Sequence, residues 1–121
     1  MSVQTRTIAV IDDDFRVVES LVNLLASYGY KAEGYNCAEQ FLESDGLSRT
    51  CCIIVDVEMR QMSGFGLLQH VKNMRSLIPV VIITGKPSEN SESFYLEKGA
   101  IGFFRKPLDG EALLKLIESV C

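Results

Sequence analysis

Five short strand-like runs, each followed by a longer segment of helical periodicity, constrain the fold of this chain more than any other feature. The runs fall at roughly residues 6–11, 30–35, 51–55, 79–83 and 101–104. The first, third and fourth are almost entirely apolar, which is typical of strands that are covered on both faces of a parallel sheet. The second and fifth are weaker strand candidates, so we expect them at the two edges of the sheet.

The segments between these runs carry apolar residues at helical spacing. Stripes of this kind lie at 18–28, 67–74 and 113–120, and a shorter one lies at 38–42. The segment at 89–98 holds only three large apolar residues, so we expect it to form the least stable helix. Strands that alternate with helices in this way predict an α/β fold, with a three-layer, doubly wound parallel sheet.

The chain has 121 residues, which is typical of one domain, and we assign residues 5–121 to it and residues 1–4 to a polar tail. The net charge is -4 and the 12 Lys and Arg residues form no run, so we expect no direct binding to nucleic acid. No apolar stretch approaches the roughly 18 residues that a membrane helix needs, and we expect a cytoplasmic protein with no membrane contact.

Cysteine usage predicts free thiols. The sequence has four cysteines and no secretory signal, so we expect all four to be reduced, with no disulfide: Cys37, Cys51, Cys52 and Cys121.

Charged and hydroxyl residues follow four of the five runs. Asp12 and Asp13 follow the first run, Asp56 the third, Thr84 the fourth and Lys106 the fifth. Because the carboxyl ends of parallel strands meet at one edge of the sheet, we expect these side chains to face one another. Crowded carboxylates repel, and a divalent cation such as Mg²⁺, which prefers hard oxygen ligands, would offset that repulsion.

This set of groups suits phosphoryl transfer. One carboxylate would act as the nucleophile and form a mixed anhydride, as aspartyl-phosphate proteins do. Lys106 and Thr84 would then neutralise and hydrogen-bond the transferred oxygens, where most of the catalysis of phosphoryl transfer lies.

Four ordered motifs give the chain a resemblance to a known family. They are "VIDDD" at 10–14, "VDVEMRQMSGFGLL" at 55–68, "IITG" at 82–85 and "GAIGFFRKPL" at 99–108. With these motifs the sequence resembles, over nearly its whole length, the receiver domains of two-component response regulators, the CheY-like superfamily. Within it, the chain is most similar to FixJ-like receivers, which precede LuxR-type helix-turn-helix outputs.

The resemblance implies a flavodoxin-like sheet with strand order 2-1-3-4-5 and five helices. It implies that Asp56 accepts a phosphoryl group from a histidine kinase, with no enzymatic activity beyond phosphorylation and dephosphorylation of the domain itself. The expected ligands of Mg²⁺ or Mn²⁺ are Asp12, Asp13, Asp56 and the backbone carbonyl of Glu58. The expected phosphate-binding and switch residues are Thr84, Gly85, Lys106 and the aromatic Phe103, with a cis bond between Lys106 and Pro107.

The partners implied by the resemblance are a sensor histidine kinase or phosphotransfer protein and an output module, C-terminal or separate, that regulates transcription. A homodimer that depends on phosphorylation is a further expectation. The readout would be the face made by the fourth helix, fifth strand and fifth helix.

The sequence departs from the family pattern at three positions. Arg60 stands where relatives usually carry proline, which predicts a differently shaped loop after the phosphoacceptor. Glu58 and Lys86 lie two residues beyond Asp56 and Thr84, and we expect their side chains to border the site and to tune how fast water reaches the acyl phosphate.

Two other functions are open to the same residues. An aspartyl phosphatase of the haloacid-dehalogenase type needs D-x-D-x-[TV]; Asp12 and Asp14 have the spacing, but Arg16 occupies the Thr/Val position. An adaptor with the receiver fold would work without phosphorylation, which the complete set of Asp, Thr and Lys residues argues against. We interpret Asp14 as a helix cap and His70 as a surface residue.

Overall fold

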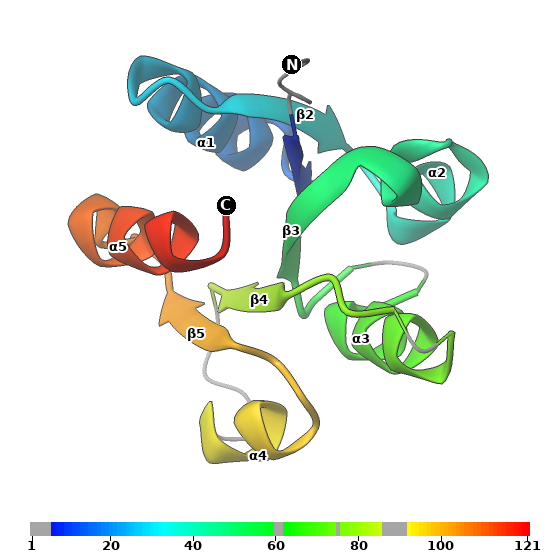
Figure 1. The fold of residues 1–121 in the computed structure, drawn as a ribbon. Helices are drawn as coiled ribbons and strands as arrows, with labels where there is room; N and C mark the ends of the chain where they lie inside the picture. The colour runs from blue at the N-terminus through cyan, green and yellow to red at the C-terminus, as the bar shows by residue number, and fades with distance from the viewer. Residues whose placement is uncertain (1–5, 60–61, 75, 86–91) are drawn as a thin grey trace.

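The computed structural model describes residues 6–59, 62–74, 76–85 and 92–121. Within these ranges the chain forms a five-stranded parallel sheet of order β2-β1-β3-β4-β5, as predicted (Figure 1). The strands are β1 (Thr7–Ile11), β2 (Lys31–Tyr35), β3 (Thr50–Asp56), β4 (Val80–Thr84) and β5 (Gly102–Arg105). Every residue of β1, β3 and β4 is buried, whereas the edge strands β2 and β5 are partly exposed. The predicted fold class is therefore confirmed.

The described residues also form five α-helices and one 3-10 helix. They are α1 (Phe15–Ser27), α2 (Ala38–Glu43), η1 (Gly46–Arg49), α3 (Gly64–Asn73), α4 (Glu92–Glu97) and α5 (Gly110–Val120). Asp14 caps α1 by accepting a hydrogen bond from the Arg16 amide, as predicted. Gly29 ends the α1 segment with a φ of 89°, a conformation that favours glycine. Only η1 was absent from the sequence prediction.

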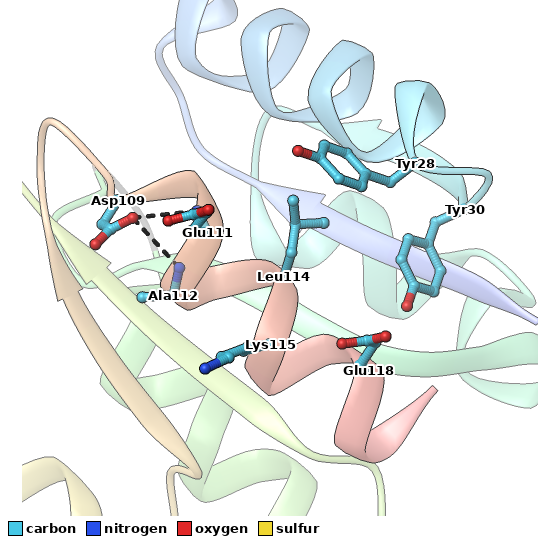
Figure 2. A pocket seen from close by; sticks show the side chains of 8 residues that line it. All are labelled: Tyr28, Tyr30, Asp109, Glu111, Ala112, Leu114, Lys115 and Glu118. Atoms are coloured by element: carbon cyan, nitrogen blue, oxygen red, sulfur yellow. Dashed lines mark hydrogen bonds between the residues drawn. The ribbon is translucent and has the colours of Figure 1, made fainter.

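One face of the sheet is covered by α1 and α5. Leu21 and Leu25 of α1 and Leu113 and Ile117 of α5 pack with Ile54 in a single buried cluster. A groove of about 550 Å³ lies along the outside of this layer, between the end of α1 and α5 (Figure 2). It is lined by Tyr28, Tyr30, Asp109, Glu111, Ala112, Leu114, Lys115 and Glu118.

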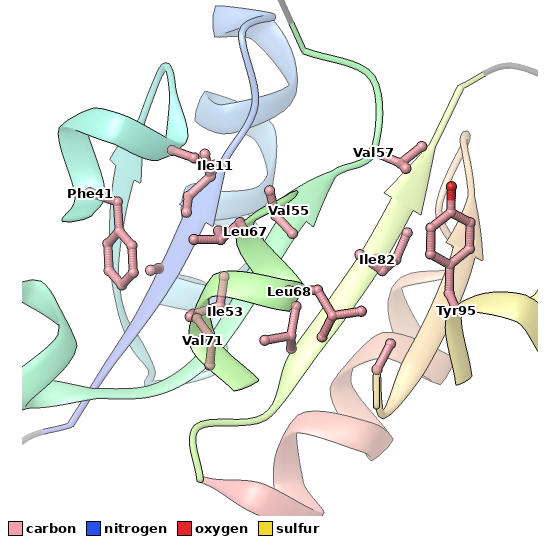
Figure 3. Packing of buried hydrophobic residues seen from close by; sticks show 14 residues of the cluster. Ile11, Phe41, Ile53, Val55, Val57, Leu67, Leu68, Val71, Ile82 and Tyr95 are labelled. Atoms are coloured by element: carbon pink, nitrogen blue, oxygen red, sulfur yellow. The ribbon is translucent and has the colours of Figure 1, made fainter. Parts of the chain in front are cut away.

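The opposite face is covered by α2, α3 and α4 (Figure 3). Phe41 of α2, Leu67 and Leu68 of α3 and Tyr95 of α4 are its large buried side chains. In the described part of α4, Tyr95 is the one buried residue, in agreement with the prediction of a thinly anchored helix. Because little apolar area holds α4, we expect it to move at low cost relative to the other helices.

The prediction of four reduced cysteines is wrong. Cys51 at the start of β3 and Cys121 after α5 form a disulfide, with their Cα atoms 5.7 Å apart. The two residues are 70 positions apart, and only the folded chain brings the end of α5 back to the start of β3. Cys37 and Cys52 are free thiols, as predicted.

No helix among the described residues is both long enough and apolar enough to cross a membrane. The polar tail at 1–4, Arg60 and Lys86 lie outside the described residues.

Candidate functional site

Three strand ends meet at the carboxyl edge of the sheet, as the sequence predicts. Asp12 follows β1 directly, Asp56 is the last residue of β3, and Lys106 follows β5. The Nζ atom of Lys106 lies 2.8 Å from Oδ2 of Asp12 and 2.5 Å from Oδ2 of Asp56. One ammonium group therefore binds two carboxylates that come from segments far apart in the sequence.

These groups are withdrawn from solvent. Asp12 is 1% exposed, Asp56 is 4% exposed, and the side chain of Lys106 is 22% exposed. Burial raises the pKa of Asp12, although the hydrogen bond from Lys106 opposes that shift. Burial also opposes the charged form of Lys106, but the hydrogen bonds to Asp12 and Asp56 prevail and raise its pKa. Lys106 is thus held as an ammonium ion.

Backbone amides orient both carboxylates. The amide of Asp14 donates to Oδ1 of Asp12 over 2.9 Å, and the amide of Glu58 donates to Oδ1 of Asp56 over 2.6 Å. Each carboxylate therefore has one oxygen on the backbone and the other on Lys106. This arrangement fixes the rotation of both side chains before any ligand arrives.

Two glycines allow close approach of other groups at the site. A Cβ atom on Gly64, the first residue of α3, would lie 2.6 Å from the backbone oxygen of Asp56, so only glycine lets α3 begin this close to β3. A Cβ atom on Gly85 would lie 3.3 Å from Cδ of Lys106, tighter than most such contacts. Gly85 therefore leaves room for the stem of Lys106, a role that its sequence position alone did not reveal.

Thr84 ends β4 at the same edge and is buried, with 1% exposed. Its hydroxyl donates to Oε1 of Glu58 over 3.4 Å, and Glu58 itself is exposed at the rim. Glu58 therefore lies beside Thr84, and its role in tuning the site stays a prediction. The predicted place of Lys86 at the border of the site is untested, because Lys86 lies outside the described residues.

Phe103 lies in the middle of β5 and is half-buried. Its ring stacks on that of Tyr95 with centroids 5.6 Å apart, and Tyr95 in turn contacts Phe94 and Phe65. The guanidinium of Arg105 lies 5.8 Å from the ring centre of Phe103. Phe103 thus joins β5 to the thinly anchored α4; whether it rotates stays a prediction. The bond between Lys106 and Pro107 is cis, as predicted.

The residues fit a divalent cation in chemistry and charge. In this arrangement no three Asp, Glu, His or Cys side chains of the described chain converge as a ligand set, since Lys106 binds both buried carboxylates and Asp13 is exposed. Three aspartates and one lysine carry a formal charge of -3 + 1 = -2, which one divalent ion would balance. Carboxylate oxygens are also the ligands that Mg²⁺ prefers. The metal ligands Asp12, Asp13, Asp56 and the Glu58 carbonyl stay a prediction.

Comparison with known proteins agrees with the motifs. Residues 8–118 match the family model of the response regulator receiver domain. Response regulator protein TodT of Pseudomonas putida is 34% identical over 98% of this chain and 52% of its own length. Transcriptional regulatory protein FixJ of Bradyrhizobium diazoefficiens is 35% identical over 93% of this chain and 55% of its own. The chain spans about half the length of these curated relatives.

A solved structure gives the same result for the fold. That of the response regulator StyR superposes with a TM-score of 0.87 at 36% identity, covering 96% of this chain and 59% of StyR.

Proposed function

The chain belongs to the response regulator receiver family of two-component systems. We propose that phosphorylation of Asp56 switches it between two conformations. Receiver domains are signalling domains that partner with histidine kinases and output domains. The phosphoryl donor proposed here is a phosphohistidine on such a kinase or on a phosphotransfer protein.

The observation that supports this proposal is the double hydrogen bonding of Asp56. Its carboxylate is buried beside the ammonium group of Lys106, and the Glu58 amide holds it in one orientation. A buried, oriented carboxylate with a cation at hand is what an in-line attack on phosphorus requires. A structural ion pair would need only one carboxylate for one lysine, whereas this site has two.

In the proposed reaction, an oxygen of Asp56 attacks the phosphorus atom and forms the acyl phosphate. The P–N bond to the donor imidazole breaks, and its electron pair stays on the imidazole nitrogen. Lys106, already 2.5 Å from Asp56, pairs with the incoming phosphoryl oxygens, and the Thr84 hydroxyl donates a further hydrogen bond. When bound by Asp12, Asp13, Asp56 and the Glu58 carbonyl, Mg²⁺ would neutralise charge on those oxygens.

The proposed readout is the face formed by α4, β5 and α5. A shift of population from about 1:99 to 99:1 needs about 5.5 kcal/mol of differential binding, which one charge-assisted pair, one hydroxyl bond and metal coordination can supply. Movement of Thr84 toward the phosphate would free space for Phe103, and Phe103 stacks on Tyr95 of α4. The thin anchoring of α4 by Tyr95 makes this helix the element that responds.

The proposed output is transcriptional regulation. TodT and FixJ are named as a response regulator and a transcriptional regulator, respectively, and each is about twice as long as the matched region. We propose that this domain controls an output module, with a homodimer through the α4–β5–α5 face in the phosphorylated state.

A labelling experiment tests the phosphoacceptor. The protein is incubated with acetyl phosphate and Mg²⁺, and the label is located by peptide mass mapping. One phosphoryl group on Asp56, lost in Asp56→Asn and kept in Asp45→Asn, an exposed aspartate away from the site, supports the proposal. Steady turnover of phosphate monoesters would instead indicate a phosphatase, and absence of label would indicate an adaptor that works unphosphorylated.

A further inference from the structure

The amino end of β3 contains a β-bulge at Cys51. In the pairing of β1 with β3, Thr7 lies opposite Thr50 and Ile8 lies opposite Cys52, so Cys51 is an extra residue without a partner on β1. A bulge of this kind bends a strand and redirects the side chain at the insertion.

The bulge decides which face of the sheet receives Cys51. Along the rest of β3 the side chains alternate: Ile53 packs in the layer of α2, α3 and α4, and Cys52 and Ile54 pack in the layer of α1 and α5. Strict alternation would send Cys51 to the face of Ile53. Cys51 instead packs in the same cluster as Cys52, on the α5 side, because the bulge breaks the alternation.

The end of α5 supplies the second sulfur. Cys121 follows α5 directly, and its amide donates to the carbonyl of Ile117, so the last helical turn fixes its position. Cys121 is exposed, whereas Cys51 is 4% exposed. The 5.7 Å between their Cα atoms lies within the range of native disulfides, and the two sulfurs are bonded.

We propose that Cys51 and Cys121 form a reversible thiol–disulfide site, which fastens the end of α5 to the start of β3 under oxidising conditions and releases it under reducing ones. The reactants are low-molecular-weight disulfides, such as oxidised glutathione, and dithiol reductants. Any residues that follow Cys121 in a longer chain would leave from this fastened point.

The exchange balances in two steps. The exposed Cys121 thiolate attacks one sulfur of a glutathione disulfide, forms a mixed disulfide and releases one glutathione thiolate. The Cys51 thiolate then attacks the sulfur of Cys121, forms the internal disulfide and releases the second glutathione thiolate. The two protons lost by the cysteines are taken up by the two glutathione thiolates, and the two electrons lost by the protein reduce the small disulfide.

The other two cysteines are unsuited to this exchange and serve as internal controls. Cys52 is fully buried, and burial raises the pKa of its thiol to about 12, so it stays protonated and unreactive. Cys37 occupies the N-cap position of α2, which follows the carboxyl end of β2, whereas Cys51 lies at the amino end of β3. The exchange is therefore confined to one pair.

The test compares the oxidised and the reduced state of each protein variant. Wild type, Cys121→Ser and the control Cys37→Ser are equilibrated with oxidised glutathione or with dithiothreitol. Non-reducing peptide mapping then reports pairing, and thermal unfolding reports stability. Cys121→Ser is the informative variant because its side chain is exposed in the folded chain, so the substitution leaves the core intact.

We expect a Cys51–Cys121 crosslink in wild type and in Cys37→Ser, opened by dithiothreitol without denaturant. Closing a loop of this length predicts a melting temperature about 10 °C higher in the oxidised state, and no difference between the two states for Cys121→Ser. Amide hydrogens of the last turn of α5 should also exchange more slowly in the oxidised state.

Three results would overturn the proposal. They are a crosslink between other cysteines, intermolecular pairing through Cys121, and an internal disulfide that dithiothreitol opens only in unfolded protein. None of these readouts uses phosphorylation, so the proposed function can fail without affecting this site.

Discussion

The two ends of the sheet are built on opposite principles. At the carboxyl end, Asp12 and Asp56 share one lysine, so a buried cluster is left with more negative than positive charge. At the amino end, a disulfide joins β3 to α5, and Arg49 of η1 pairs with Glu33 of the edge strand β2. The excess negative charge at the carboxyl end favours the binding of a cation. The disulfide and the ion pair at the amino end instead stabilise the packing of the elements that they join.

This difference indicates that the carboxyl end of the sheet serves function at a cost in stability, whereas the amino end serves stability. Buried carboxylates destabilise a fold unless they are fully paired, so their presence at the carboxyl end points to a function that needs them. Links at the amino end carry no such penalty. Removal of a carboxylate at the carboxyl end should therefore stabilise the fold, whereas removal of a cation there or of a link at the amino end should destabilise it.

Removal of the shared cation should have the largest effect. Lys106→Met leaves Asp12 and Asp56 buried without a cation, and we expect the free energy of unfolding to fall by about 2 kcal/mol at neutral pH without divalent cations. Urea unfolding measures this loss. Lys115→Met, at an exposed position on α5, is the matched control and should change stability by less than about 0.5 kcal/mol. Equal losses in the two variants would contradict the importance of the shared ammonium.

Removal of one carboxylate should have the opposite sign. Asp56→Asn relieves the repulsion between Asp56 and Asp12 and leaves Lys106 paired with Asp12, so we expect a gain of about 1 kcal/mol in the free energy of unfolding. Asp13→Asn, at an exposed position one residue beyond Asp12, should change it by less than about 0.5 kcal/mol. A clear loss of stability in Asp56→Asn would show that the two carboxylates do not strain the site.

The ion pair at the amino end should have the smallest effect. The hydrogen bond from Arg49 lowers the pKa of Glu33 below its ordinary value of 4.5, although partial burial opposes the shift. Its contribution is therefore present above pH 4.5 and is lost as the pH falls through the lowered pKa. Because both side chains are about one-third exposed, we expect Glu33→Gln to cost less than about 1 kcal/mol at pH 7.

The pH dependence of the stability difference distinguishes the ion pair from other effects of the Glu33→Gln substitution. Denaturation of wild type and Glu33→Gln at pH 7 and at pH 3 should give a difference between the two proteins at pH 7 that shrinks at pH 3. A difference that stayed constant with pH would assign the effect to packing of the glutamate stem.

The strands could be predicted from the sequence because buried parallel strands have an unmistakable composition. The runs that become β1, β3 and β4 are apolar on both faces, and their predicted limits agree with the structure to within one residue. The helix η1 was missed because its four residues are too few for a periodic pattern. Because the carboxylates and Lys106 follow the predicted ends of these strands, the sequence also predicted that they lie together at the carboxyl edge of the sheet.

Features that depend on tertiary contact could not be predicted. The bulge at Cys51 shifts the register of β3 by one residue, and an unbroken apolar run contains no sign of such a shift. The disulfide depends on this bulge and on the path of α5. The contact of Lys106 with both Asp12 and Asp56 was likewise missed, since the sequence predicted pairing with phosphate and did not indicate where the ammonium lies beforehand.

A crystal structure with Mg²⁺ and beryllofluoride tests the central claim, that Asp56 is the phosphoacceptor of this site, most directly. Beryllofluoride mimics the phosphoryl group on an aspartate, and we expect it bonded to a carboxylate oxygen of Asp56. Lys106 should have turned from Asp56 to a fluoride, Thr84 should donate to another, and Asp13 should coordinate the metal. A pocket without beryllofluoride under these conditions, or with Lys106 still bridging Asp12 and Asp56, would contradict the assignment.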